Sequence, residues 1–286
     1  MSLATATPEG TGSGDVFAAR ALRVRERILR MCASPDGGHL GGSMSLVEIL
    51  MVLQTRILRI NPADPDHPAR DILLLSKGHG AIGLYAVLAE VGFFPPDRVI
   101  EYGNPGGPFM AHPNPEIAGV EMPAGSLGHG LPVGLGQALA ARLAGTDRRC
   151  VVVMGDGELQ EGSVWEAAMA AGSLGLDQLV AVVDRNGLQI TGDTESVVRL
   201  EPLADRWRSF GWTTYEVDGH DPEELTAVLR RPPVAARPTV VIARTSKGHG
   251  VPFIEGQTRS HFAKLGERQY QKAVAALHNW AREETS

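Results

Sequence analysis

The sequence has little cysteine and no long apolar run, and both absences narrow the class of protein. Only two cysteines, Cys32 and Cys150, occur among 286 residues. Cys32 falls in a helical pattern and Cys150 at the start of a buried strand, so we interpret both as reduced core thiols. No apolar run reaches transmembrane length, and the N-terminus lacks the charged-then-apolar pattern of a signal peptide. We therefore expect a cytoplasmic protein that does not act in a membrane.

Positive charge is also scarce in any one part of the sequence. There are 27 lysines and arginines against 33 acidic residues, which gives a net charge of −6, and no basic cluster stands out. Nucleic-acid-binding domains carry a basic patch or stripe, so this class is excluded. A hydrophobic fraction of 43% with 21% charged residues is typical of a soluble globular enzyme. The length allows one large α/β core or at most two small ones.

Four stretches have the pattern of strands that are buried on both faces. They lie at residues 71–75, 151–154, 179–183 and 239–243, and helical patterns alternate with them. This alternation predicts an α/β fold with one parallel sheet flanked by helices on both faces. Residues 1 to about 14 are small, polar and glycine-rich, and we expect a disordered tail there. We expect residues 15–286 to form a single domain.

The stretch from Cys150 to Gly192 combines two of these strands with polar turn residues. It reads CVVVMGDGELQEGSVWEAAMAAGSLGLDQLVAVVDRNGLQITG. The first strand ends at a Gly-Asp-Gly turn that contains Asp156, a helical pattern follows, and Asn186 comes directly after the second strand. This βαβ unit places Asp156 and Asn186 at the carboxyl edge of the sheet, where open α/β sheets bind ligands.

An edge with these residues suits a diphosphate that is held through a divalent ion. Mg²⁺ prefers hard oxygen ligands, and it often keeps only one or two protein side chains beside phosphate oxygens. Glycines let the backbone approach a phosphate closely, and a helix start offers free N–H groups. A bare Gly-Asp-Gly is also an ordinary strand-to-helix turn. Here, however, 28 residues (158 to 185) separate Gly157 from Asn186, which follows a second buried strand. A dinucleotide site fits worse, because GDGELQEG lacks the G-x-G-x-x-G spacing.

Several histidines lie between glycines or just after strands. His39 occurs in GHLGG, before a helix expected to begin near Ser43, and His79 occurs in SKGHG after the strand 71–75. The remaining examples are His112 in AHP, His129 in GSLGHG, His249 in a second SKGHG and His261 further on. Core packing explains a histidine in a flexible glycine loop poorly. Beside a diphosphate motif, these histidines therefore predict an active site.

The motif that begins at Gly155 resembles the thiamine-diphosphate-binding motif, a Gly-Asp-Gly followed at about this interval by Asn. The fuller match, GDGxLQEG with Trp-Glu-Ala just after it, is similar to the transketolase family in particular. Gly-His-x-Gly, Leu-Ser-x-Gly-His-Gly, Ala-His-Pro and Gly-Ser-Leu-Gly-x-Gly also occur in this order in transketolases. The resemblance covers residues 15 to about 265 and implies the thiamine-diphosphate-binding fold. It extends only over the pyrophosphate-binding domain, the first of the two such domains that a transketolase site needs.

The resemblance implies the ligands of a metal ion and of thiamine diphosphate. Asp156 and Asn186 would bind Mg²⁺ or Ca²⁺ through their side chains, and Leu188 through its backbone carbonyl. Gly157 would donate its N–H to the diphosphate.

The resemblance also assigns roles to four histidines as candidate catalytic residues. His79 and His261 would contact the diphosphate and the substrate hydroxyls. His39 and His112 would line the site of the donor ketose, where imidazoles can move protons near neutral pH.

Five further residues match family positions near the aminopyrimidine of the cofactor. Gly125 and Leu127 would touch this ring, and Ile190 would pack on it. Glu161 and Glu166 match carboxylates at the subunit interface near the pyrimidine end, although solvated helix glutamates look the same in sequence.

Three positions depart from the family pattern or do not contribute to it. His129 stands where the family usually has Gln, which leaves its role open. Split transketolases typically have Trp-His-Gly around the last histidine, whereas here His261 lies between Ser260 and Phe262. Lys-Gly-x-Gly is the family's turn around His249, so we interpret that histidine as a turn residue.

The resemblance implies the N-terminal subunit of a split transketolase, which transfers a two-carbon ketol unit between sugar phosphates. Its partner would be a C-terminal, pyrimidine-domain subunit in an α₂β₂ assembly. Three alternatives stay open: transfer to a lipoyl or carrier-protein thiol, the E1α subunit of a 2-oxoacid dehydrogenase, and a non-catalytic scaffold or regulator. The E1α fold would not be expected to carry this set of glycine-flanked histidines. The sequence does not identify the donor or the acceptor.

Overall fold

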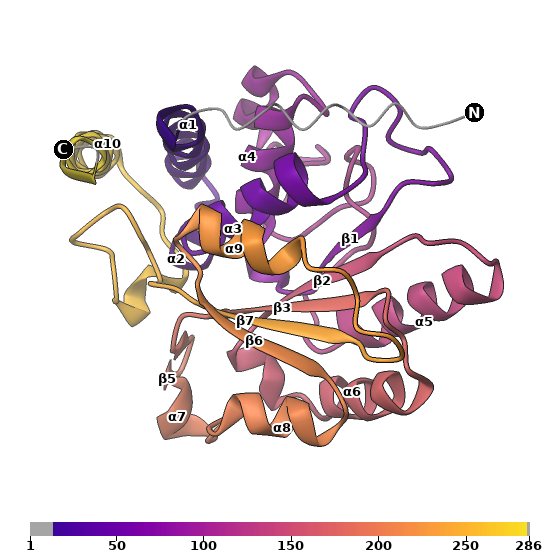
Figure 1. The fold of residues 1–286 in the computed structure, drawn as a ribbon. Coiled ribbons are helices and arrows are strands. Elements are labelled where there is room, and N and C mark those ends of the chain that lie inside the picture. Colours follow the sequence, from indigo (N-terminus) through magenta and orange to yellow (C-terminus); the bar gives the residue numbers. More distant parts are fainter. Residues whose placement is uncertain (1–13, 285–286) are drawn as a thin grey trace.

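The computed structural model describes residues 14–284, and a five-stranded parallel sheet lies at its centre (Figure 1). The strand order is β1-β2-β3-β7-β6, and every neighbouring pair runs parallel. The strands of the sheet are β1 (Ile72–Leu75), β2 (Cys150–Gly155), β3 (Leu179–Arg185), β7 (Thr239–Arg244) and β6 (Thr213–Asp218). A separate antiparallel pair, β4 (Leu188–Gln189) with β5 (Gly192–Asp193), follows β3.

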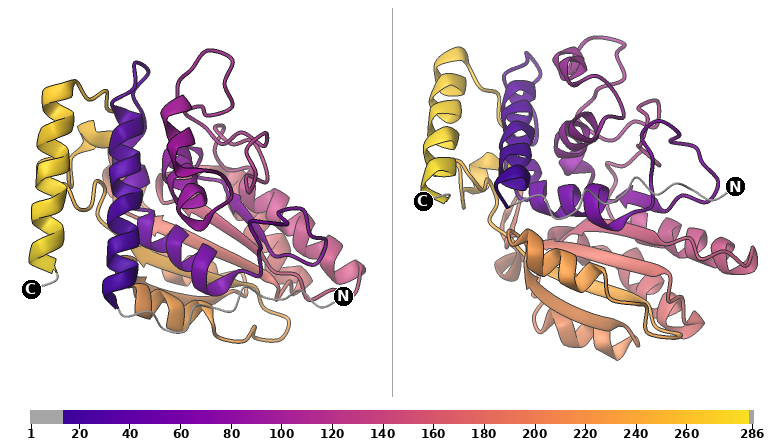
Figure 2. Two further views of the ribbon diagram at one scale, coloured as in Figure 1. Left: turned by 90° about the horizontal axis from the view of Figure 1, so that it is seen from above. Right: turned by 45° about the horizontal axis from the view of Figure 1, so that its top comes forward.

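Helices cover both faces of the sheet (Figures 1 and 2). One face carries α1 (Gly14–Cys32), α2 (Leu40–Met44), α3 (Val47–Val52), α4 (Ala81–Val91) and α9 (Pro222–Leu229). The other carries α5 (Gly130–Leu143), α6 (Gly162–Leu174), α7 (Thr194–Val197) and α8 (Leu203–Ser209). The last helix, α10 (Glu267–Glu284), packs alongside α1 at the edge of the molecule. The parallel α/β sheet with helices on both faces confirms the predicted fold class.

Alternation along the strands separates two hydrophobic cores. Leu73 of β1 and Val151 of β2 are paired and point into the core under α1 to α4, whereas Leu74 and Val152 point into the core over α5, α6 and α8. All four side chains are buried, because a parallel sheet has helices on both faces. The strands therefore read as continuous apolar runs in the sequence.

The predicted strands are all present. The differences concern the start of one helix, one edge strand of the sheet and the N-terminal residues. The helix expected near Ser43 begins at Leu40, so His39 directly precedes its first turn. Strand β6 has no counterpart in the prediction, because only one of its six side chains, that of Val217, is buried. The predicted tail, 1 to about 14, lies outside the described residues except for Gly14, which begins α1. No helix within residues 14–284 is long and apolar enough to cross a lipid bilayer.

The outer edge of β6 is protected by charge. Glu216 and Asp218 are exposed on this strand, and Glu216 pairs with Arg244 of the neighbouring strand. Glu224 of α9 accepts a hydrogen bond at 2.8 Å from the backbone N–H of Asp218. Such features discourage another strand from pairing with an open sheet edge.

Candidate active site

The carboxyl ends of β1, β2, β3 and β7 surround one cavity of about 220 Å³. Predicted residues that line it are His39, His79, Leu127, Asp156, Gly157, Glu161, Asn186, Leu188, Ile190 and His261. Segments far apart in the sequence meet here, because parallel strands all present their carboxyl ends at the same edge of the sheet. The structure thus brings most of the predicted site residues together.

The three residues predicted to bind a metal ion, Asp156, Asn186 and Leu188, line one side of the cavity, which we call the oxygen wall. Asp156 is 2% exposed; its Oδ2 accepts from the N–H of Gly187 at 2.6 Å, and Arg185 lies 3.1 Å away. Oδ1 of Asn186 accepts from the N–H of Leu188 at 3.1 Å. These bonds fix the turn after β3. The side-chain oxygens of Asp156 and Asn186 have further lone pairs that a metal ion could use.

The electrostatics of Asp156 favour a bound cation. Burial, followed by repulsion from Asp184, raises the pKa of Asp156 above its usual value. A nearby divalent ion would reverse this cost by favouring the carboxylate form. The N–H of Gly157, predicted to face a diphosphate, donates to Oδ1 of Asp156 at 2.8 Å in this structure. It would have to exchange that neighbouring acceptor for a phosphate oxygen.

Two buried lysines flank the oxygen wall, and sequence reasoning missed both. Lys77 follows β1, where its ammonium pairs with the fully buried Asp184 and donates to the carbonyl of Gly42 at 3.0 Å. Lys247 follows β7 and donates to the carbonyl of Leu188 at 3.0 Å. A cation therefore already contacts the carbonyl that was predicted as a metal ligand. The pentapeptide SKGHG, which contains each lysine and occurs at both strand ends, is the sequence feature that could have indicated them.

Lys247 lies in an electrostatic environment that disfavours its charged form. Burial, and then repulsion from Lys77, lowers the pKa of Lys247 to about 8. Its Nζ also lies 3.3 Å from Nδ1 of His261. Incoming negative charge would relieve the repulsion between the two ammonium groups, so the environment of Lys247 suits a polyanion.

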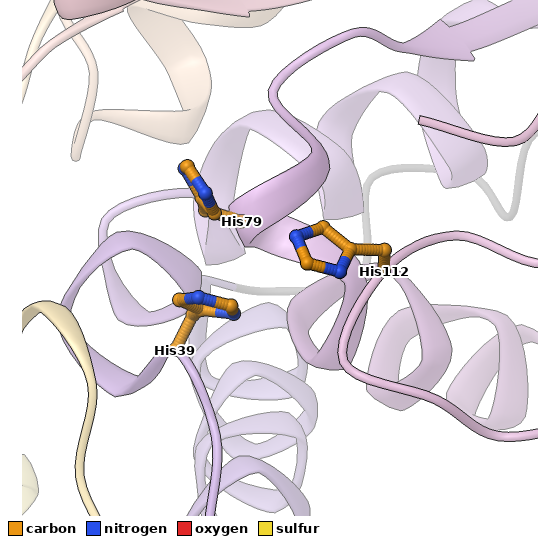
Figure 3. Close-up of side chains that lie close together, drawn as sticks. All are labelled: His39, His79 and His112. Atoms are coloured by element: carbon orange, nitrogen blue, oxygen red, sulfur yellow. The ribbon is translucent and has the colours of Figure 1, made fainter. Parts of the chain in front are cut away.

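Four histidine rings form a cluster at this cavity, and three of them, His39, His79 and His261, belong to its lining. The ring centroid of His39 lies 4.6 Å from that of His79 and 5.4 Å from those of His112 and His261. The centroid of His79 lies 5.6 Å from that of His112 and 4.9 Å from that of His261. Figure 3 shows the side chains of His39, His79 and His112 close together. The position of His261, in doubt from its neighbours in sequence, is thus within the cluster.

These histidines are neutral near pH 7. Burial is the largest cause, and repulsion within the cluster adds to it for three of the rings. The pKa falls to about 4 for His39 and His79 and to about 3 for His261, and burial also lowers the pKa of His112. Neutral imidazoles offer one donor and one acceptor each, which suits contacts with sugar hydroxyls.

The cavity contains polar atoms that lack protein partners. Nδ1 of His39 and Oε1 of Gln189 are buried without a hydrogen-bond partner, and both residues line the cavity. Unpaired buried polar atoms are rare in native proteins and point to an absent water or ligand. Oxygen donors, two cations and these free atoms together fit a metal–diphosphate group with an adjacent polar substrate.

A buried carboxylate, Glu158, joins several segments of the cavity lining through hydrogen bonds. It accepts hydrogen bonds from the hydroxyl of Ser76 and from the N–H groups of Gly128 (3.0 Å) and Gly155 (3.1 Å). Glu158 thereby links the ends of β1 and β2 to the loop that precedes α5. No local sequence pattern indicates this role, because two of the three partners are distant along the chain.

The residues predicted near the aminopyrimidine are dispersed. Leu127 and Ile190 line the cavity, and Ile190 is 67% exposed at its mouth. Glu161 lines the cavity at the start of α6, whereas Glu166 is exposed further along that helix and is not part of the lining. A Cβ added to Gly125 would lie 3.2 Å from the ring of His112, so this glycine faces the histidine cluster.

The remaining histidines and both cysteines lie away from this chemistry. His129 is exposed, and its Nε2 lies 3.1 Å from the hydroxyl of Ser126. His249 is in a turn and stacks on His220 with ring centroids 3.5 Å apart, outside the cavity lining. Cys32 and Cys150 are free and buried, as predicted, and burial raises both thiol pKa values.

Comparison with known proteins agrees with this architecture. A family described as "Transketolase, thiamine diphosphate binding domain" matches residues 18–284. The 6-deoxy-6-sulfo-D-fructose transketolase subunit SqwG of Clostridium sp. (strain MSTE9) is 41% identical over 256 residues, which cover 89% of this chain and 93% of that protein. One of the apulose-4-phosphate transketolase subunits, from Actinobacillus succinogenes, is 42% identical over 251 residues, 87% of this chain and 91% of that protein. A crystal structure of transketolase from Campylobacter jejuni aligns with a TM-score of 0.85 and 29% identity, over 93% of this chain and 43% of that one.

Fold and site together define an α/β protein of the thiamine-diphosphate-binding class. The chain belongs to the transketolase family. It corresponds to the N-terminal, thiamine-diphosphate-binding subunit of transketolases that are divided between two chains.

Proposed function

We propose that this chain is the pyrophosphate-domain subunit of a two-chain, Mg²⁺- and thiamine-diphosphate-dependent transketolase that acts in the cytoplasm. It would transfer a two-carbon ketol unit from a ketose or ketose phosphate to an aldose or aldose phosphate. One observation carries the proposal: a single cavity is lined by oxygen donors, two lysines and three neutral histidines. A site for an anionic cofactor thus adjoins a site for a polyhydroxyl substrate.

Asp156, Asn186 and the Leu188 carbonyl would hold the metal ion, Mg²⁺ or Ca²⁺. The diphosphate would lie between Gly157, His79, His261 and the ammonium of Lys247. Leu127 and Ile190 provide apolar contact at the cavity mouth, where Ile190 is exposed. When bound, thiamine diphosphate supplies the electron sink that permits cleavage of a C–C bond next to a carbonyl.

The histidines would position the donor and move its hydroxyl protons. His39 offers the free lone pair or N–H of its buried Nδ1, which lacks a protein partner. His112 approaches from the opposite side of the cluster (Figure 3), and the hydroxyl of Tyr85 fixes its backbone by donating to its carbonyl at 2.7 Å. Because the low pKa values keep these rings neutral, each has a nitrogen lone pair that can accept a hydrogen bond from a donor hydroxyl at neutral pH.

A pyrimidine-domain subunit would complete the site from the side of α5 and α6. These packed helices expose Val133, Leu143, Met169 and Leu174, in addition to Ile190 at the cavity mouth. An exposed apolar surface of this kind favours a protein interface. Glu161 and Glu166 would face that interface. Two-fold closure is the commonest symmetry of oligomers, which favours an α₂β₂ assembly.

The proposal is tested by titrating thiamine diphosphate into the assembled two-chain protein in the presence of Mg²⁺. Asp156→Ala should abolish Mg²⁺-dependent cofactor binding, because it removes one of two side-chain ligands and leaves the diphosphate charge poorly neutralised. Asp205→Ala, an exposed substitution on α8, is the matched control and should bind normally. Unchanged cofactor affinity in Asp156→Ala would remove the basis of the assignment.

A further inference from the structure

Two groups of side chains within residues 14–284 have the composition and spacing of a metal site. In the group of His39, His79 and His112, one ligand atom from each residue lies within 4.8 Å of the others. The same holds for Glu48, a residue of α3, with His220 and His249. The hydrogen bonds around each group distinguish them.

The second group has its ligand atoms committed to protein partners. Nε2 of His220 accepts from the N–H of Ser246 at 2.8 Å, so its Nδ1 carries the proton and donates to Glu48 at 3.0 Å. Arg25 forms a buried ion pair with Glu48 at 2.8 Å, which neutralises the carboxylate. A cation here would have to displace both partners, so this group carries no metal site.

The first group has the opposite character. Nδ1 of His39 is buried and has no hydrogen-bond partner. The three rings lie close together (Figure 3), although each comes from a separate segment of the chain. We propose that His39, His79 and His112 bind a borderline divalent cation such as Zn²⁺, with the fourth coordination position left to water or a substrate oxygen.

The geometry requires only small side-chain rotations. Zinc–nitrogen bonds of 2.0–2.1 Å place two ligand nitrogens of a tetrahedral ion about 3.3 Å apart. The ligand nitrogens now lie within 4.8 Å of one another, and they would reach this spacing if each ring moved by roughly 1 Å. The bond from Tyr85 to the carbonyl of His112 holds the backbone of that ligand in place. Low pKa values also keep the imidazole lone pairs free of protons at neutral pH.

This site is chemically distinct from the oxygen wall. Imidazole ligands favour Zn²⁺, Co²⁺, Ni²⁺ and Cu²⁺, whereas carboxylate and carbonyl oxygens favour Mg²⁺ and Ca²⁺. His112 belongs to the histidine site and does not line the cavity that contains Asp156. If the proposed function holds, a zinc ion here would occupy the place of the donor sugar. Zinc would then inhibit ketol transfer in competition with the donor, while Mg²⁺ and thiamine diphosphate stay bound.

The test uses untagged, metal-free protein and Co²⁺ as a probe, because tetrahedral Co²⁺ absorbs strongly in the visible range. We expect one Co²⁺ per chain with a tetrahedral spectrum, and its displacement by Zn²⁺. His112→Ala should weaken Co²⁺ binding by on the order of 100-fold, since a ligand is lost. His249→Ala removes a member of the other group and should leave the titration unchanged.

His39→Gln is a second variant that retains hydrogen-bonding capacity and should also lose the spectrum, with circular dichroism confirming that both variants are folded. An octahedral spectrum, an unchanged titration in His112→Ala, or loss of binding in His249→Ala would overturn the proposal. Thiamine diphosphate binding is measured in parallel. Cofactor binding without Co²⁺ binding would refute this inference alone, and the converse would refute the proposed function alone.

Discussion

At the scale of residues, His79 and His112 should have separable roles. His79 lines the cavity beside the oxygen donors, whereas His112 contacts the cluster from outside that lining. We predict that His112→Ala lowers kcat by about 100-fold or more and leaves the affinity for thiamine diphosphate unchanged. His79→Ala should lower both. The measurements are steady-state kinetics and cofactor titration of the two-chain protein; an equal loss of cofactor affinity in both variants would contradict this division.

The depressed histidine pKa values should make the fold sensitive to mild acid. A histidine whose pKa is about 4 in the folded state and 6.5 in the unfolded chain binds its proton first in the unfolded chain. Unfolding is therefore favoured as pH falls below 6.5, and this loss continues down to the folded-state pKa near 4. We predict a fall in melting temperature between about pH 7 and pH 5.

The comparison for this pH effect is a His79→Asn, His261→Asn double variant. Asparagine has similar hydrogen-bonding groups but does not titrate, so the fall between about pH 7 and pH 5 should be smaller in this variant. The buried carboxyls of Asp156 and Glu158, whose pKa values are raised mainly by burial, are common to both proteins and cancel. Parallel curves for the two proteins would refute the assignment.

His39 and His79 stand out in the sequence because each lies in a glycine loop where core packing explains a histidine poorly, whereas His112 and His261 were assigned from the family resemblance. Lys77, Glu158 and Asp184 could not be predicted from sequence, since their roles come from partners distant in sequence. Lys77 and Asp184 are 107 residues apart, and Ser76 and Glu158 are 82 residues apart. Only the folded sheet brings these pairs together.

At the scale of elements, the repeated SKGHG turns use the same residues differently. After β1, Lys77 pairs with the buried Asp184, and the turn presents His79 to the cavity. After β7, Lys247 also lines the cavity but donates to the carbonyl of Leu188, and His249 turns away to stack on His220. A motif repeated at two strand ends therefore does not imply a repeated role.

This difference predicts that the same substitution at the two lysines affects different properties, stability at Lys77 and cofactor binding at Lys247. Lys77→Met leaves a fully buried carboxylate without its cation and should lower the free energy of unfolding by about 3–5 kcal/mol. Lys247→Met should change stability little, yet weaken thiamine diphosphate binding by roughly tenfold or more, because a charged hydrogen bond is lost. Urea unfolding and cofactor titration separate the two effects. Adding Asp184→Asn to Lys77→Met should restore part of the lost stability; no restoration would argue against the pair.

Strands were predicted correctly where their side chains are buried on both faces, and one was missed where burial varies along the strand. Strands β1, β2, β3 and β7 are buried on both faces, and their apolar runs reveal them. Edge strand β6 is half exposed and has no clear period. The start of α2 at Leu40 was missed because Gly41 and Gly42 are not typical of a helix. Close packing requires a glycine here, since a Cβ on Gly41 would lie 2.4 Å from the Ser260 hydroxyl.

At the scale of the whole molecule, we predict that the chain alone is catalytically inactive. The described residues form one five-stranded parallel sheet and contain no second one of this kind. In the proposed assembly, the surface beside α5 and α6 would be covered by the pyrimidine-domain subunit. The purified chain with Mg²⁺ and thiamine diphosphate should show no ketol transfer, and addition of the partner should restore it together with an α₂β₂ mass by light scattering. Robust turnover by the single chain would refute the two-chain function.

In the proposed two-chain assembly, the protected edge of β6 would matter most between synthesis of the chain and its assembly. A chain without its partner would expose the apolar side chains of α5 and α6, and an unprotected sheet edge would add a template for backbone-mediated association. Glu224 occupies an N–H on that edge, and the charges of Glu216 and Asp218 repel an approaching identical strand. In the proposed assembly, this edge would discourage unassembled copies from pairing through their backbones, so free subunits would stay available to the partner.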